Sequence, residues 1–361
     1  MNGILWSSRC VLYSREISPA PDSPIRNGKP LFGSYSGAFE HFDIRGLKRP
    51  FGNYPLPVLL TNLRIFESIR FLFCDDQHIG EIELFNAHYF AYMETVMWNR
   101  ETKQKIAYRK IIFPGFIRIQ RSFGNTVAAC RSHSRFVRIH TRLQRKQIHT
   151  DFDFIGSDSR PPCEGYLEMN VSAPDAADFS SVLPYKVKRK CQISYQVSAP
   201  LQGWISTGFD DHQIMPDRGI GYLDVRKTYM SLRTKGSSLI GMGKKNGQTV
   251  TFRFGNSVYR DDNLYNDNVL FWGGKAWPMP PVKITRPYGV MGEWIIQDTE
   301  SMVDLVFIPE LDNARRLSAF IVRTEYHSIY GTFSGELVTT ESIKIGLKDF
   351  PGIVKKFILR V

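Results

Sequence analysis

The sequence is poor in cysteine, with five in 361 residues, and no two of them form a C-x-x-C pair. An odd number of widely separated cysteines argues against a disulfide framework and against a zinc site, so we predict no metal centre. The chain also lacks the motifs G-x-x-x-x-G-K-[ST], G-x-G-x-x-G and G-x-S-x-G. These absences remove support for nucleotide hydrolysis and for α/β-hydrolase chemistry, and no cofactor is predicted.

Long apolar runs are missing as well. No window approaches the roughly 20 apolar residues that a membrane-spanning helix needs, so no transmembrane segment is predicted. The first residues lack the basic segment and the continuous apolar core of a secretory signal, and we therefore expect a cytoplasmic location. Acidic residues are outnumbered by basic ones, 35 to 47, which gives a formal net charge of +12. Such a basic excess attracts nucleic acid, anionic lipid or acidic small molecules.

Aromatic residues are abundant, with 25 Phe and 16 Tyr, and no long window is rich in Leu and Ala. This balance favours strands. The clearest alternation covers residues 136–144, where Val137, Ile139 and Thr141 face one way and polar or basic residues face the other. Asn246-Gly247 is a strong hairpin-turn signal, and turn signals recur at the spacing typical of sandwiches and barrels. We predict an all-β fold of two antiparallel β barrels or sandwiches packed together, with few short helices.

Two loops divide the chain near its middle. Residues 157–162 read S-D-S-R-P-P, and residues 172–181 are rich in Ala, Asp and Ser. We predict an N-terminal barrel or sandwich domain over residues 1–180 and a C-terminal one over residues 181–361. The first domain begins with a segment rich in proline and glycine, in which spaced aromatics predict a cover over a sheet or barrel mouth.

Polar chemistry concentrates in residues 203–235. The stretch holds Asp210, Asp211 and His212, followed by Asp217 and Arg218 before two glycines. Adjacent carboxylates push one another's pKa values apart and a histidine titrates near neutrality, so the group suits acid–base work. We take Asp217, His212 and Asp211 as candidate catalytic residues. The alternative is a loop between strands, in which Asp and Arg side chains cap backbone groups and pair with each other.

Aromatic residues in and around the same stretch suit the wall of an apolar cavity. Together with one arginine they form the predicted ligand-binding set, which is Trp204, Phe209, Arg218, Tyr222 and Tyr229.

Two other clusters have simpler interpretations. Residues 261–268 are rich in Asp and Asn, but their spacing is not that of an EF-hand, and we interpret them as a solvated turn. A basic row on the alternating strands is suited to phosphates, although its interleaved apolar residues follow from strand alternation alone. Asp151 and Asp153 on the next strand can pair with this row. The row consists of Arg118, Arg121, Arg131, Arg135, Arg138, Arg142, Arg145 and Lys146.

The order of motifs in the C-terminal half resembles a known family. A W-P-x-P-P turn at residues 277–281 precedes V-D-L-V-F-I-P at 303–309, and H-S-I-Y-G-T-F-S-G-E-L follows at 327–337. These motifs are similar to those of the bacterial family catalogued as domain of unknown function 2804, with a looser match in the N-terminal half. Where that family has tryptophans near its middle, this chain has Tyr222 and Tyr229. The matching positions are Asp304, Leu305, Phe307, Pro309, His327, Tyr330, Gly331, Phe333 and Gly335.

The resemblance implies a lipocalin-like double barrel, an architecture in which some proteins hydrate or cyclise isoprenoid-type lipids. Three functions follow as hypotheses. The main one is a non-catalytic binder of a hydrophobic or amphipathic small molecule in a barrel cavity. The second is a hydratase, cyclase or isomerase acting on an isoprenoid-like lipid. The third is a binder of nucleic acid or of an anionic membrane surface through the basic row, with nucleic acid the less favoured partner.

Overall fold

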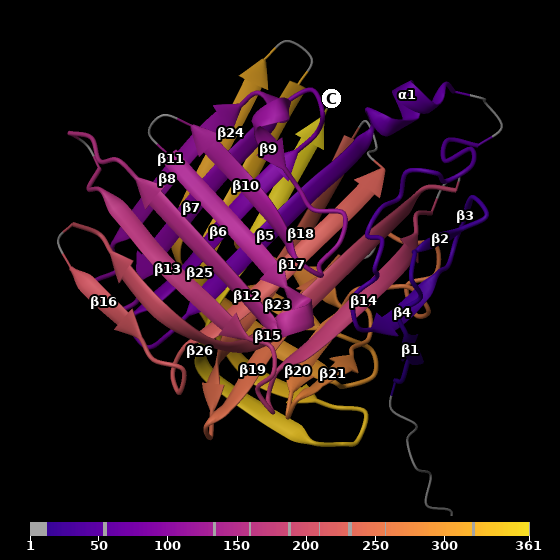
Figure 1. Cartoon of the computed structure of the whole chain (residues 1–361). Coiled ribbons are helices and arrows are strands. Elements are labelled where there is room, and N and C mark those ends of the chain that lie inside the picture. Colours follow the sequence, from indigo (N-terminus) through magenta and orange to yellow (C-terminus); the bar gives the residue numbers. More distant parts are fainter. Residues whose placement is uncertain are drawn as a thin grey trace, which may run out of the picture.

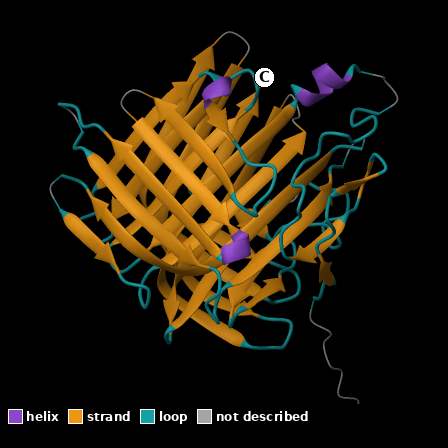
Figure 2. Cartoon of the chain, viewed as in Figure 1, coloured by secondary structure: helices purple, strands orange, loops and turns teal. Residues whose placement is uncertain are grey.

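The structure, a computed structural model, is built almost entirely from strands (Figure 2). It describes residues 13–52, 56–132, 135–158, 160–186, 189–208, 210–229, 233–256, 258–319 and 322–360. Within these ranges the helical segments are α1 (Val58–Asn62) and two short 3-10 turns, η1 (Pro114–Phe116) and η2 (Leu143–Arg145). No helix in the described ranges is long and apolar enough to cross a membrane.

The first sheet has 15 strands and curls into a nearly closed barrel (Figure 1). Four strands lie off its main path, namely β1 (Ile17–Pro19), β4 (Gly33–Ser36), β14 (Ala177–Pro184) and β16 (Asp211–Ile214). The main path runs, in spatial order, through β8 (Lys105–Ile112), β7 (Ala91–Asn99), β6 (His78–Asn86), β5 (Ile65–Cys74), β17 (Ile220–Tyr229), β15 (Cys191–Ser206), β13 (Cys163–Asn170), β12 (Gln147–Phe154), β11 (Arg135–Arg142), β10 (Thr126–Ser132) and β9 (Ile117–Arg118).

The second sheet has nine strands and forms a curled half-barrel packed beside the first. A separate hairpin joins β2 (Ile25–Arg26) to β3 (Lys29–Pro30). The nine strands, in spatial order, are β21 (Lys275–Pro278), β20 (Val269–Trp272), β19 (Gln248–Gly255), β18 (Arg233–Lys245), β26 (Lys344–Arg360), β25 (Val322–Val338), β24 (Val303–Ala319), β23 (Trp294–Gln297) and β22 (Lys283–Thr285).

The ends of the barrel path meet near η1, which joins β8 to β9 along the chain. Asn86, at the end of β6, bridges this point: its side-chain amide donates hydrogen bonds to the carbonyl of Pro114 at 3.0 Å and to that of Ile117 at 2.9 Å. Asn86 is buried, and these bonds give its side-chain amide two acceptors where the ends of the path meet.

Strand alternation divides the side chains of the barrel wall between two environments. On β5, Ile69, Phe71 and Phe73 belong to the apolar core inside the barrel, whereas Leu72 packs toward the second sheet. The barrel core also takes in the leading segment, where Phe42 is fully buried and its ring lies 4.9 Å from that of Phe123. The interior is therefore occupied in large part by the protein's own side chains.

The contact between the two sheets is apolar on one side. Trp98 on β7 and Tyr330 on β25 are both buried, with ring centroids 6.1 Å apart. Tyr222 on β17 and Phe271 on β20 meet in the same way at 6.1 Å. Residues far apart in the chain thus form one cluster that joins the sheets.

The other side of this contact is a buried ionic network. Lys355 on β26 contacts both Glu81 and Glu83 on β6, the latter at 3.1 Å, and Arg70 contacts Glu81 at 2.5 Å. Arg315 on β24 joins Glu83 at 3.6 Å. Buried charges are costly unless they are paired, so the two sheets must meet in a register that keeps these partners together.

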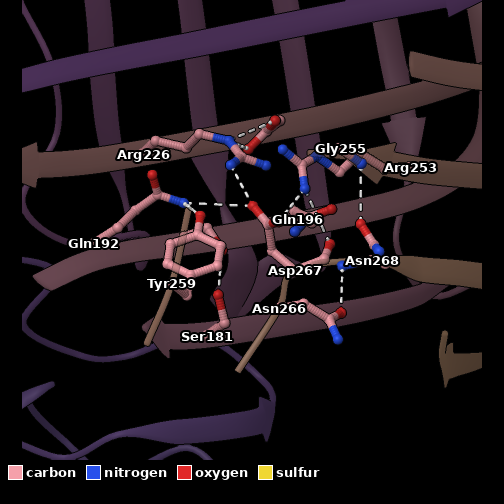
Figure 3. A network of polar contacts seen from close by, with 12 residues as sticks. Ser181, Gln192, Gln196, Arg226, Arg253, Gly255, Tyr259, Asn266, Asp267 and Asn268 are labelled. Carbon is pink, nitrogen blue, oxygen red and sulfur yellow. Dashed lines mark hydrogen bonds and ion pairs between the residues drawn. The ribbon is translucent and has the colours of Figure 1, made fainter. Parts of the chain in front are cut away.

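Asp224 continues the network, since it lies 3.9 Å from Arg70 and 2.8 Å from Arg226. Figure 3 shows its far end, where Asp267 lies between Arg226 and Arg253. The Arg226–Asp267 distance is 2.5 Å, and Gln192 donates to the Tyr259 hydroxyl at 2.7 Å beside it. Asp267 is 4% exposed, so the interpretation of residues 261–268 as a solvated turn is wrong for the second half of that segment. The two arginines, which lie on strands, make its burial tolerable.

The prediction of an all-β fold made of two barrel-like sheets is confirmed. The first sheet ends at Tyr229 and the second begins at Arg233, later in the chain than the expected boundary near residue 180. The division into two domains stays a prediction.

Candidate functional site

A hollow of about 700 Å³ opens at the end of the barrel where β5 passes into β6. Its wall mixes carboxylates, a histidine, an arginine and a few less polar side chains. The lining residues are Asp75, Asp76, Gln77, Glu101, His212, Gln213, Met215, Asp217 and Arg218.

The turn between β5 and β6 fixes one carboxylate at this site. Oδ1 of Asp75 accepts hydrogen bonds from the backbone N–H groups of Gln77 at 3.1 Å and His78 at 2.7 Å. Aspartate favours such turns because its short side chain reaches the backbone two residues later. The turn leaves Oδ2 of Asp75 free for another partner.

That partner is His212 on β16, which pairs with the end of β15. Nε2 of His212 and Oδ2 of Asp75 form a very short contact, and the two side chains are 18% and 5% exposed. The His78 ring lies 4.8 Å from the His212 ring. Residues 137 positions apart in the chain therefore form a compact cluster, which we call the Asp–His–His cluster: Asp75, His78 and His212.

His78 has donors near it rather than acceptors. Nε2 of its ring faces the side-chain amide nitrogen of Asn99 at 3.4 Å, and Nδ1 has no hydrogen-bond partner within the described residues. Burial lowers the pKa of His78 and outweighs the raising effect of the Asp75 carboxylate. The neutral ring, with a lone pair to offer, is the favoured form.

The cluster suits two kinds of chemistry. A histidine oriented by a buried carboxylate is an acid–base pair. One carboxylate and two imidazoles are also ligands for a divalent cation, and the three ligand atoms here lie within 4.8 Å of one another.

The candidate catalytic residues occupy different places. His212 lines the hollow as part of the Asp–His–His cluster, and Asp217 stands at its mouth with a side chain 73% exposed. Arg218 lies 3.2 Å from Asp76 and 3.9 Å from Asp217. Asp211, at the start of β16, is exposed.

The predicted ligand-binding aromatics are not brought together. Trp204 on β15 is 37% exposed, and Tyr222 is buried against the second sheet, where its hydroxyl donates to Gln196 at 2.7 Å. Tyr229 is buried near the opposite end of β17 and donates to the carbonyl of Ile44 at 2.9 Å. Phe209 lies outside the described residues. A role for this set in ligand binding stays a prediction.

Sequence reasoning missed Asp75, Asp76 and His78. The run Asp-Asp-Gln-His at residues 75–78 indicates only a turn between two strands when it is considered alone. A signal was present nonetheless, because the chain repeats two adjacent aspartates followed closely by a histidine at residues 210–212.

Comparison with known proteins gives a family and a fold. The model of the family described as "Domain of unknown function (DUF2804)" matches residues 31–359. Among solved structures, kievitone hydratase from Nectria haematococca is similar, with a TM-score of 0.51 and 7% sequence identity over 81% of this chain and 88% of that chain. At that identity the likeness shows the fold alone. A search of the curated proteins finds no match. Since the match spans nearly the whole sequence, the chain belongs to the DUF2804 family.

Proposed function

We propose that the protein is an enzyme that adds water to, or removes water from, a small amphipathic molecule bound in the hollow at the barrel end. The observation that carries this proposal is the contact of His212 with the buried Asp75 carboxylate in a hollow large enough for a small molecule. Kievitone hydratase has a similar fold and is by its name a hydratase, which supports the proposal.

The proposed chemistry starts from the proton on His212. When Asp75 accepts the hydrogen bond from Nε2–H, the lone pair of the ring lies on Nδ1. Nδ1 takes a proton from water while the hydroxyl oxygen bonds to the electron-poor carbon of a double bond. The imidazolium, stabilised by Asp75, then returns the proton to the neighbouring carbon. Arg218 at the mouth supplies a positive charge for a polar end of the substrate.

An isotope experiment tests this proposal. The protein is incubated in ¹⁸O-labelled water with a panel of prenylated and α,β-unsaturated compounds, and products are analysed by mass spectrometry. We expect a product that gains one labelled water, formed about 10²–10⁴-fold more slowly by H212N. H140N, on the exposed outer wall of the barrel, is the control and should match the unchanged protein. The proposal fails if no compound gains label, or if H212N is as fast as H140N.

Binding without catalysis, the main hypothesis from the sequence, differs from this proposal in where the ligand sits. It would need space inside the barrel, where the described side chains form a continuous apolar core. Native mass spectrometry of protein purified from several hosts distinguishes the two. A lipid that co-purifies with H212N as well as with the unchanged protein would favour simple binding.

A second candidate function, binding to an anionic membrane surface, rests on the opposite end of the barrel. There, exposed apolar side chains gather on α1 and its approach, on the β6–β7 turn and around η1. We call this set the apolar rim: Leu56, Val58, Leu59, Leu60, Leu63, Tyr89, Phe113 and Phe116.

Hydrogen bonds tie the three segments of the apolar rim together. His88, next to Tyr89, contacts the carbonyl of Ile65 through Nδ1 at 2.8 Å, just after α1. Asn86 holds the carbonyl of Pro114 in η1. Val58 and Phe113 are 71% and 73% exposed, and exposed apolar residues that gather at one end of a fold often mark an interaction surface.

Positive charge accompanies the apolar rim. Arg64 follows α1, and Lys110 and Arg118 flank η1, while Glu67 nearby is paired with Arg45 and Lys227. Apolar side chains beside basic ones match the boundary of an anionic bilayer, where acyl chains lie under negative headgroups.

Vesicle flotation tests membrane binding directly. The protein should float with vesicles that contain phosphatidylserine, and less with vesicles of phosphatidylcholine alone or at high salt. L59E and F113E should lose flotation, whereas Y288E, at a side chain 79% exposed elsewhere, should keep it. Equal flotation of all three variants would reject this candidate.

A further inference from the structure

We infer that Asp75, His78 and His212 form a site for one divalent transition-metal cation of the zinc class, with an open coordination position toward the hollow. The three side chains come from the β5–β6 turn, the start of β6 and β16. Their ligand atoms lie within 4.8 Å of one another and border a space of about 700 Å³. Three protein ligands and one open position are the usual composition of a reactive zinc site.

The ligand types fit this class of cation. Imidazole nitrogen suits zinc, copper, iron and nickel, whereas calcium and magnesium take oxygen ligands almost alone. Zn–N and Zn–O bonds of about 2.0–2.2 Å put tetrahedral ligand atoms about 3.3–3.6 Å apart. Nε2 of His212 and Oδ2 of Asp75 must therefore move apart slightly, while the ring nitrogen of His78 moves toward them. His212 lies on a short strand next to the turn that carries Asp75, so rotation of the two imidazoles can close the site.

Two hydrogen bonds hold the Asp75 carboxylate as an outer shell would. Two backbone N–H groups fix Oδ1 of Asp75 and leave Oδ2 for the ion. His78 has no hydrogen-bond acceptor at either ring nitrogen within the described residues, so its ring has a lone pair and no partner for a bound proton. A neutral imidazole of this kind is a ready metal ligand.

Local charge attracts a cation although the whole protein is basic. Asp76, Asp217 and Glu101 line the hollow with Asp75. Arg218 is the basic residue in the lining. An acidic spot on a chain of net charge +12 concentrates cations where the remaining surface repels them.

For catalysis this inference rests on the proposed function and deepens it. The cation replaces the proton on Nε2 of His212 and takes Oδ2 of Asp75 as a second ligand. A water in the open position then loses a proton more easily, because a bound cation lowers the pKa of its water. In the loaded protein His212 is a ligand, and a carboxylate of the lining such as Asp76 takes the proton from the bound water. The hydroxyl oxygen bonds to the electron-poor carbon of the double bond, and the carboxylic acid then returns the proton to the neighbouring carbon.

Metal binding is measured without any substrate. The full chain is stripped with EDTA and titrated with Zn²⁺ by calorimetry, and with Co²⁺ by visible absorption, which reports imidazole coordination. We expect one ion per chain. H78A and H212A should each weaken binding by at least about 100-fold, since loss of an outer-shell partner alone costs 10–100-fold. Circular dichroism of the stripped variants confirms that they are folded.

The matched control is another histidine pair on the outer wall of the barrel. His140 and His149 have rings 4.8 Å apart, the same separation as His78 and His212. H140A and H149A should bind Zn²⁺ as the unchanged protein does. The inference is overturned if the unchanged protein binds no stoichiometric ion, or if H78A and H212A bind as tightly as the controls. Failure of the isotope assay alone would leave the metal site standing, and failure of metal binding would leave water addition by His212 standing.

Discussion

Replacing Lys355 by methionine tests whether the buried ionic network holds the two sheets together. Lys355 is 3% exposed and is shared between Glu81 and Glu83. In K355M both carboxylates remain buried with one cation fewer. Breaking a buried ion pair by removing one partner typically costs about 3–5 kcal/mol, because an uncompensated charge stays behind. We therefore expect the free energy of unfolding to fall by about that amount.

Urea denaturation followed by circular dichroism and tryptophan fluorescence measures this change. K275M is the control, since Lys275 and Glu341 form a pair that is 63% and 58% exposed, and its loss should cost less than about 1 kcal/mol. The double variant E83Q/K355M should lose less than the sum of its single variants, because it removes one charge of each sign. If K355M were as stable as K275M, the buried charges would not be what holds the two sheets together.

Three further outcomes follow from the structure. Burial would raise the pKa of Glu83, but Lys355, Arg315 and Arg70 outweigh it and lower the pKa to about 2. Stability from this group is thus present above the unfolded pKa of about 4.3 and is lost as pH falls toward 2. Urea midpoints should therefore drop less in E83Q than in the unchanged protein between pH 5 and pH 3. G335A should destabilise the protein by about 1–3 kcal/mol, because Gly335 has φ +134° and an added Cβ would meet the carbonyl oxygen of Asp304. G346A, in open surroundings, should change the stability little, and thermal unfolding compares the two variants. Burial raises the pKa of Cys74 and of Cys191 to about 12, so peptide mass spectrometry should find neither thiol alkylated by iodoacetamide at pH 8 until the protein unfolds.

Local patterns in the sequence predict local structure well here. The alternation at residues 136–144 matches β11 as far as Arg142, whereas Leu143 and Gln144 lie in η2. Arg138 lies opposite Asp151 on β12 with a 2.9 Å ion pair, as the two rows of charges predict. The hairpin signal Asn246-Gly247 joins β18 to β19, with positive φ at both residues. Each of these features is settled by residues close together in the chain, where period and turn chemistry decide the outcome.

The pairing of distant segments leaves no such trace. β17 pairs with β5 over ten residues, although about two fifths of the chain separates them, and no local pattern in either strand names its partner. The site depends on this pairing, because it helps bring the end of β5 to the region of β16. Asp75 therefore gives only a turn signal in the sequence, while His212 stands out beside its own aspartates.

The Asp–His–His cluster is inferred to hold one divalent cation beside the hollow. A crystal equilibrated with Zn²⁺, with diffraction data collected at the zinc absorption edge, tests it most directly. We expect one strong anomalous peak about 2.0–2.2 Å from a ring nitrogen of His78, a ring nitrogen of His212 and a carboxylate oxygen of Asp75. A map with no peak among these three residues, or with a peak only between His140 and His149, would contradict it.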